Sequence, residues 1–220
     1  MKKIIALGGG EIGRPGYPIE TTQIDKEIIK LTGKKNPKLL FIPTASSDSE
    51  SYYEVVKKHF GKRLGCKTNV LYLIKEKLSQ KEIKEKILNS DIIYVGGGDT
   101  LKMMRVWKKN GVDKILKQAY EKGVVLSGLS AGSICWFKYG ISDSKRFTNP
   151  NAGLIKVSGL ENKAKIVEFS KSQDLERHHS LALYMDMADL PAVQAVLGLQ
   201  ATISDSAEVR QLMVQYAEKD

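Results

Sequence analysis

With 220 residues, of which 42% are hydrophobic and 27% charged, the chain is long enough for one well-buried domain and has an ordinary globular composition. No apolar run approaches the roughly 18 residues of a membrane span, so we expect no membrane association. The formal net charge is +10, but no arginine cluster or aromatic–basic pattern accompanies it, and we expect no nucleic-acid partner.

Charge and cysteine usage indicate how the chain is organised. Residues 161–220 hold 6 Lys or Arg and 10 Asp or Glu, a net charge of −4, so residues 1–160 carry +14. We therefore treat 1–160 as one domain and 161–220 as a divergent C-terminal part packed on that domain. Cys66 and Cys135 are far apart and form no recognisable pattern, which predicts a reduced, cytoplasmic protein.

Apolar strand patterns alternate with helical patterns through the first 130 residues. The initial apolar run is short and ends in glycines, so it predicts a strand over 3–7 rather than a signal peptide. Later strands are expected over 37–44, 68–73, 91–95 and 124–126. Helices are expected over 22–32, 52–61, 80–88 and 112–122, and a further helix is expected to begin at 101. His59, in the helix over 52–61, is expected to lie on the surface. This order predicts an α/β fold, a parallel sheet flanked by helices.

The glycine-rich segment 8–13 fits the spacing G-x-G-x-x-G of dinucleotide-binding loops. In such loops a helix begins inside the motif, whereas here Pro15 and Pro18 follow and favour an extended chain. We therefore predict a loop that lines the ends of the strands, and no nicotinamide cofactor.

Residues 128–132, Gly-Leu-Ser-Ala-Gly, match the pattern Gly-x-Ser-x-Gly. They lie between an apolar strand and an apolar segment, 133–137, that predicts a buried helix, and this is the context of a nucleophile elbow. In an elbow, the hydroxyl of Ser130 projects from the end of the sheet and the amide of Ala131 faces a developing oxyanion. A buried turn of small residues is the alternative; we favour the nucleophile.

Three consecutive glycines, residues 96–98, end the strand expected over 91–95. One interpretation is a tight turn that packs a helix against a strand. Because parallel strands bring their C-terminal ends to one edge of the sheet, the other is a second oxyanion donor that faces Ser130. We favour the second interpretation.

Four stretches together resemble the peptidase E family of serine peptidases, which includes dipeptidase E and cyanophycinase. They are residues 5–10, 41–46, 93–100 and 128–137, and the tract 139–144 also fits. The resemblance covers about residues 1–160 and implies the fold of class I glutamine amidotransferases.

The resemblance also implies a catalytic set without a metal or organic cofactor. It casts Ser130 as the nucleophile and the amides of Gly98 and Ala131 as the oxyanion hole, with a histidine base and an acidic third member. Asp143 keeps a family-like position and is our candidate for orienting the base; the alternative is that it caps a turn. Dipeptidase E removes an N-terminal aspartate from dipeptides, which suggests a short peptide substrate here.

The C-terminal part departs from the family pattern. Family members carry the histidine on a strand after the serine, but the corresponding window, roughly residues 160–170, contains none. The nearby candidates are His178 and His179, of which one at most points inward, because adjacent residues on a strand face opposite ways. We choose His178 as the base; the alternative is that both lie in a charged surface loop.

Two functions are consistent with this pattern. The first is a serine peptidase that hydrolyses short peptides through an acyl-enzyme. The alternative is a catalytically inactive relative that lacks the base and binds a peptide or partner protein. A cysteine nucleophile is set aside, because Cys135 lies inside the predicted helix. Analogy with the fold alone suggests a homodimer.

Overall fold

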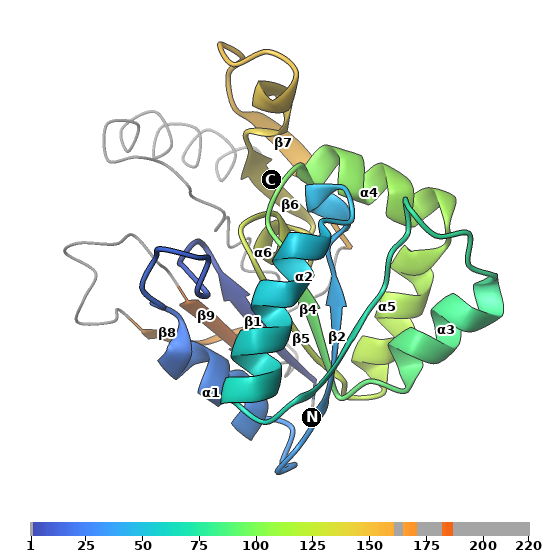
Figure 1. Cartoon of the computed structure of the whole chain (residues 1–220). Helices are drawn as coiled ribbons and strands as arrows, with labels where there is room; N and C mark the ends of the chain where they lie inside the picture. Colours follow the sequence, from blue (N-terminus) through green and yellow to red (C-terminus); the bar gives the residue numbers. More distant parts are fainter. Residues whose placement is uncertain (1, 161–164, 171–181, 187–220) are drawn as a thin grey trace.

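A computed structural model of the chain describes residues 2–160, 165–170 and 182–186 (Figure 1). Its main sheet has seven strands in the order β3-β2-β4-β5-β1-β9-β8. These are β1 (Lys3–Leu7), β2 (Lys38–Ile42), β3 (Lys67–Val70), β4 (Ile92–Val95), β5 (Val125–Leu129), β8 (Lys165–Ser170) and β9 (Ala182–Asp186). Strands β1 to β5 are parallel, whereas β9 and β8 extend the sheet antiparallel beyond β1. The predicted α/β fold with a central parallel sheet is confirmed.

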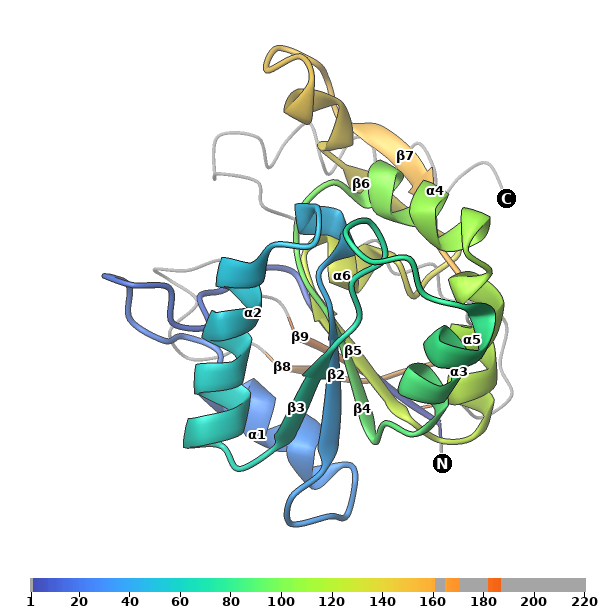
Figure 2. The ribbon, with the colours of Figure 1, turned by 45° about the vertical axis from the view of Figure 1, so that its right-hand side comes forward.

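Helices cover both faces of this sheet (Figure 2). On one face lie α1 (Thr22–Lys30), α2 (Glu50–Val56) and the π-helical η2 (Lys57–Arg63). On the other face lie α3 (Gln80–Leu88), α4 (Thr100–Lys109), α5 (Val112–Glu121) and the short α6 (Ala131–Ile134).

The two hydrophobic cores follow from the pleat of the strands. Successive strand residues face opposite sides. In β2, Leu40 and Ile42 therefore join the core under α3 to α6, while Leu39 and Phe41 join the core under α1 and α2. Because both faces are covered, the central strands β1, β2, β4 and β5 are mostly buried and apolar, as is typical of buried parallel sheets, whereas the edge strand β3 is polar and partly exposed.

The helix after β2 differs from its prediction, and so does His59. The helix begins at Glu50, after Ser49 caps it, and then continues with π-helical winding through Lys57–Arg63. The expectation that His59 is a surface residue is wrong, since its side chain is buried. Its Nε2 lies 2.8 Å from Oδ2 of Asp25 in α1, and this buried carboxylate compensates for the loss of water around the ring.

A second, two-stranded sheet projects from the main body at the top of Figure 1. It consists of β6 (Tyr139–Ser142) and β7 (Ile155–Ser158), which are antiparallel, with the 3₁₀ turn η3 (Ser144–Phe147) between them. A hydroxyl cluster fixes its base to the start of α4: Ser142 Oγ donates to Thr100 Oγ1 at 3.1 Å, and Ser144 Oγ accepts from the Leu101 amide at 3.0 Å.

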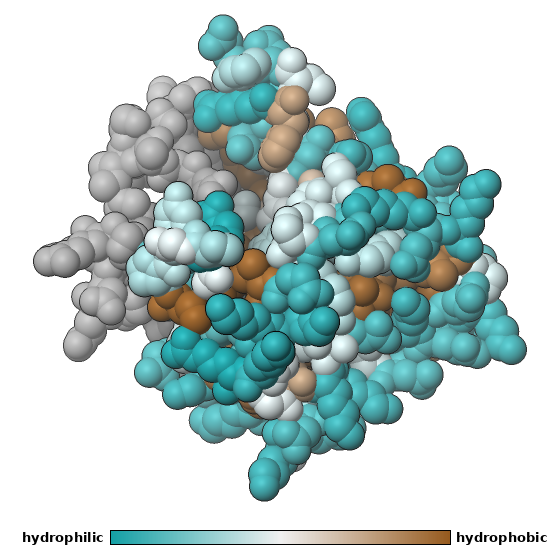
Figure 3. Space-filling model, in the orientation of Figure 1, coloured by the Kyte–Doolittle hydropathy of each residue, from teal (hydrophilic) through white to brown (hydrophobic). Residues whose placement is uncertain are grey.

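The molecular surface is mainly hydrophilic on the face that carries α2 and α3 (Figure 3). None of the helices in the described part of the chain has the length and apolar content that crossing a bilayer requires.

Candidate active site

Ser130 occupies a strained turn at the end of β5. Its backbone has φ 55° and ψ −111°, a combination that residues with a Cβ seldom adopt. The amide of Ser130 donates to the carbonyl of Leu7 at the end of β1, with 2.9 Å between N and O, so the turn is tied to the neighbouring strand. The predicted succession of strand, strained turn and helix is therefore present.

Two glycines around the serine let α6 start very close to the sheet. A Cβ on Gly132 would overlap the backbone carbonyl of Val95 in β4, and a Cβ on Gly128 would overlap the carbonyl of Gly132. Larger residues at these positions would push helix and strands apart. Both glycines therefore permit the close approach of helix and strand.

The glycine turn after β4 faces the serine from the neighbouring strand. Gly98 has φ 137°, and a Cβ there would overlap the carbonyl of Ala45. A Cβ placed on Gly97 would lie 3.4 Å from Cβ of Ser130 and 3.9 Å from its Oγ. The glycine turn and Ser130 are thus in direct contact and form one continuous surface.

The two amides predicted to stabilise an oxyanion are available for that role. Among the described residues, the backbone amides of Gly98 and Ala131 have no hydrogen-bond partner. Gly98 lines the same cleft as Ser130, and Ala131 follows Ser130 directly in the chain. Amides that are free beside a nucleophile are the donors that an oxyanion hole requires.

A cleft of about 1010 Å³ opens beside Ser130. Its walls are the loop 10–17 after β1, the first turns of α2 with Lys58, the turn residues Gly97 and Gly98, and Leu129. The prediction that segment 8–13 forms a loop along the strand ends is therefore confirmed.

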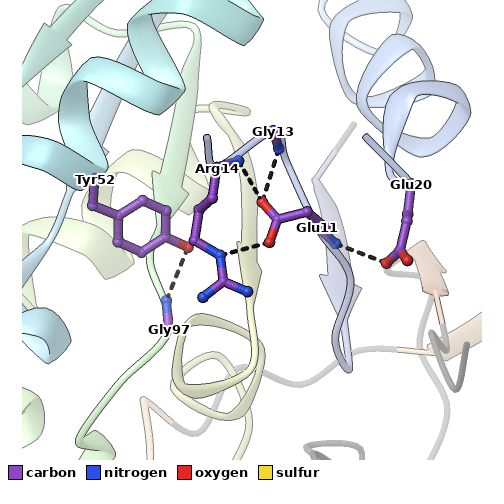
Figure 4. Close-up of polar contacts among 6 residues, drawn as sticks. All are labelled: Glu11, Gly13, Arg14, Glu20, Tyr52 and Gly97. Atoms are coloured by element: carbon purple, nitrogen blue, oxygen red, sulfur yellow. Dashed lines mark hydrogen bonds and ion pairs between the residues drawn. The ribbon is translucent and has the colours of Figure 1, made fainter. Parts of the chain in front are cut away.

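Glu11 and Arg14 shape the loop side of the cleft (Figure 4). The Glu11 carboxylate accepts from the amides of Gly13 and Arg14, at 2.9 and 2.7 Å, and from Nε of Arg14 at 2.6 Å. Burial acts to raise the pKa of Glu11, but these hydrogen bonds outweigh it, so the pKa lies below its ordinary value and the carboxylate stays ionised. The guanidinium group of Arg14, which lines the cleft, is ion-paired with Glu11 and lies 4.9 Å from the centroid of the Tyr17 ring, while its terminal nitrogens make no hydrogen bond to a described residue.

Tyr52 of α2 reaches the glycine turn from the opposite wall. Its hydroxyl oxygen accepts a hydrogen bond from the Gly97 amide, with 3.4 Å between N and O (Figure 4). Burial raises the pKa of Tyr52 to about 12, so the phenol keeps its proton at neutral pH.

The acidic and basic candidates from the sequence lie apart from this cleft or beyond the described residues. Asp143 precedes η3, where its carbonyl oxygen accepts from the Arg146 amide at 2.7 Å, and it does not line the cleft. Its role as the third catalytic member stays a prediction, whereas the alternative that its side chain caps a turn is wrong, because that side chain makes no capping hydrogen bond at the start of η3. His178 and His179 lie outside the described residues.

Sequence analysis missed the side chains that line the cleft opposite the serine. An acidic and a basic residue three positions apart in a glycine-rich loop were a usable signal for the Glu11–Arg14 pair. Tyr52 gave no such signal, because nothing in the sequence distinguishes it from other residues at the start of a predicted helix.

Cys135 is unsuited to act as a nucleophile. Its side chain is fully buried, and burial raises the pKa of its thiol well above the ordinary value. Within the described ranges, no cluster of three or more His, Cys, Asp or Glu residues could hold a metal ion.

Comparison of the sequence with protein-family models finds one family that matches most of the chain. The model of Peptidase family S51 matches residues 4–196. The chain belongs to this peptidase family. The resemblance to peptidase E is thereby confirmed.

The curated relatives of this S51 chain are peptidases by name and are longer than the aligned region. Uncharacterized peptidase YgaJ of Bacillus subtilis (strain 168) is 39% identical over 146 residues, which are 66% of this chain and 60% of the relative. Uncharacterized peptidase Lmo0363 of Listeria monocytogenes is 31% identical over 125 residues, 56% of this chain and 54% of the relative. The chain thus spans a little over half the length of the curated relatives that it matches.

Solved structures of two peptidases share the fold. A peptidase from an acI-B1 actinobacterium has a TM-score of 0.56 at 21% identity, over 73% of this chain and 64% of that one. A protein from Listeria monocytogenes EGD-e assigned to peptidase E has a TM-score of 0.53 at 23% identity, over 73% and 74%. At these identities the likeness supports the fold of the S51 chain rather than its substrate.

Proposed function

We propose that this S51 protein is a serine peptidase that hydrolyses short peptides. The observation that carries the proposal is the position of Ser130, in a strained turn that lines a cleft and near the amides of Gly98 and Ala131, which have no hydrogen-bond partner in the described part of the chain. A nucleophile needs this exposure, and the oxyanion that forms during acyl transfer needs such donors.

In the proposed reaction, Oγ of Ser130 attacks the peptide carbonyl carbon and its proton passes to a histidine, for which His178 is our candidate. The amides of Gly98 and Ala131 donate to the oxyanion. The C–N bond then breaks and the histidine gives its proton to the leaving amine. Water attacks the carbonyl carbon of the resulting ester while the same histidine takes a proton from the water. The bond between the carbonyl carbon and Oγ then breaks, the histidine returns the proton to Oγ of Ser130, and the carboxylic acid product leaves. Asp143 is the candidate for orienting the histidine.

The charges of the cleft support a short, zwitterionic substrate. Arg14 and Lys58 contribute positive charge and Glu11 and Glu54 contribute negative charge to the lining, and Arg14 is ion-paired with Glu11 through its Nε. A dipeptide carries one ammonium and one carboxylate group, so a cleft with both signs offers a partner to each end.

A dipeptide panel tests the proposal. We would measure hydrolysis of dipeptides with acidic, neutral and basic N-terminal residues by the wild-type protein, Ser130→Ala and Cys135→Ala. We expect Ser130→Ala to reduce turnover by about 10³-fold or more and Cys135→Ala to retain it. His178→Ala and His179→Ala, compared with each other, identify the base.

The same panel also separates the alternative function. A folded wild-type protein that hydrolyses none of the dipeptides, yet binds some of them in calorimetry, would contradict the peptidase proposal and favour the inactive, peptide-binding relative. Equal turnover by wild type and Ser130→Ala would also contradict it.

A further inference from the structure

Gly97 connects Tyr52 to the nucleophile. Its amide donates to the hydroxyl oxygen of Tyr52, with 3.4 Å between N and O (Figure 4). Gly97 also packs directly against Ser130, since a Cβ placed on Gly97 would lie 3.9 Å from Oγ of Ser130. All three residues line the same cleft. Gly97 therefore contacts both the Tyr52 hydroxyl and Ser130, whose Oγ is the reacting oxygen.

Packing and hydrogen bonding fix the position of Tyr52. Its ring packs edge-on against Phe41, with 5.0 Å between ring centroids and 65° between the planes. A Cβ on Gly96 would come within 2.8 Å of the Tyr52 ring, so the ring sits tightly on the glycine turn. Ser49 caps the helix by accepting from the Tyr52 amide at 3.2 Å, which fixes the backbone as well.

The hydroxyl of Tyr52 still has a hydrogen to donate. A phenol can accept one hydrogen bond and donate another. The Gly97 amide uses the acceptor, and no acceptor for the hydrogen is present among the described residues. The phenol also remains protonated at neutral pH, as its burial ensures.

We propose that Tyr52 is a further catalytic residue, which donates its hydroxyl hydrogen to the oxygen that becomes negatively charged when Ser130 attacks. It would act as a third donor beside the amides of Gly98 and Ala131, and it would hold the glycine turn in register with the serine. This inference rests on the proposed peptidase function.

The test uses a fluorophosphonate, a probe whose phosphoryl oxygen gains charge as a serine attacks. Tyr52→Phe removes only the hydroxyl. Tyr53→Phe is the matched control: that ring stacks on the same Phe41, at 6.4 Å and 11°, but its hydroxyl donates to the carbonyl of Thr68 and is not part of the cleft. Thermal unfolding of both variants checks that they are folded.

We expect Tyr52→Phe to lower the maximal rate of inactivation at least about tenfold, approaching the hundredfold or more typical of a lost oxyanion donor. We expect the probe concentration for half-maximal rate to change less than about threefold, because the hydroxyl acts in the transition state. Tyr53→Phe should behave as wild type.

The failures of the two proposals are distinguishable. If the wild-type protein reacts and Tyr52→Phe reacts at the same maximal rate, or weakens only probe binding, the role of Tyr52 is wrong and the peptidase proposal stands. If the wild-type protein itself does not react, the peptidase proposal fails and the role of Tyr52 fails with it.

Discussion

The backbone of Ser130 is strained. The proposed reactivity requires this conformation, whereas the stability of the fold does not. A residue held in such a sparsely populated conformation costs about 1–3 kcal/mol. Glycine adopts it freely, but a glycine also gives the unfolded chain more conformational freedom, at a cost of about 0.5–1 kcal/mol. We therefore expect Ser130→Gly to be more stable than Ser130→Ala, which keeps the strained Cβ, although both lack the nucleophile.

Urea unfolding of the two variants measures this difference. We expect the free energy of unfolding of Ser130→Gly to exceed that of Ser130→Ala by about 1 kcal/mol. A Ser130→Gly protein less stable than Ser130→Ala would mean that the turn is relaxed and that the elbow stores no strain.

Asp25 should make stability depend on pH in a particular direction. Its carboxyl is fully buried, and burial raises its pKa above the ordinary 3.8 although hydrogen bonds from His59 and Thr21 oppose the shift. The folded state therefore binds the proton more tightly than the unfolded state. The resulting stabilisation is complete below pH 3.8 and is lost as the pH rises through the folded-state pKa.

The comparison of wild type with Asp25→Asn measures the contribution of this carboxyl together with its contact with His59, because the titrating groups away from this pair are common to both. We expect the stability of wild type relative to Asp25→Asn to fall as the pH rises above about 4, by at most about 1.4 kcal/mol per pH unit. Urea unfolding between pH 4 and 7 measures it. A relative stability that rises with pH would instead show that the carboxylate is stabilised in the fold.

At the scale of elements, packing and helix propensity predict opposite effects on stability when Gly132 in α6 is replaced by alanine. Alanine is a better helix former than glycine by about 1 kcal/mol. A Cβ on Gly132, however, would overlap a backbone carbonyl of β4, which cannot turn aside as a flexible side chain could. We expect packing to dominate, so that Gly132→Ala lowers the free energy of unfolding by about 2 kcal/mol.

Gly153→Ala is the control for this substitution, because a Cβ there meets no atom within 4 Å and its backbone needs no positive φ. It should change the free energy of unfolding by less than about 0.5 kcal/mol. A stabilised Gly132→Ala protein would contradict the close approach of α6 and β4.

Local sequence signals located most elements but not every boundary. The helix predicted over 80–88 has those bounds, because Ser79 and Glu82 form a capping box that is legible in the sequence. The helix predicted over 52–61 begins earlier, after the cap at Ser49, and its π-helical continuation left no local sign. Apolar periodicity indicates that a segment is buried, but not how tightly it winds.

At the scale of the whole molecule, the sequence could predict which loops meet but not which side chains pair. Parallel strands bring their C-terminal ends to one edge, so the turns after β1, β4 and β5 were expected together. The pairs His59–Asp25 and Tyr52–Gly97 join segments 34 and 45 residues apart, and no periodicity records such contacts. His178 lies outside the described residues and Asp143 does not line the cleft, so the catalytic roles of both stay predictions.

The central claim, that Ser130 is an activated nucleophile, is tested most directly by covalent labelling. We would incubate the protein with a fluorophosphonate, read the intact mass, and map the modified peptide, with Ser130→Ala as the control. The account predicts one adduct per chain, located on Ser130 and absent from the variant. A folded wild-type protein without an adduct, or an adduct on another residue, would contradict it.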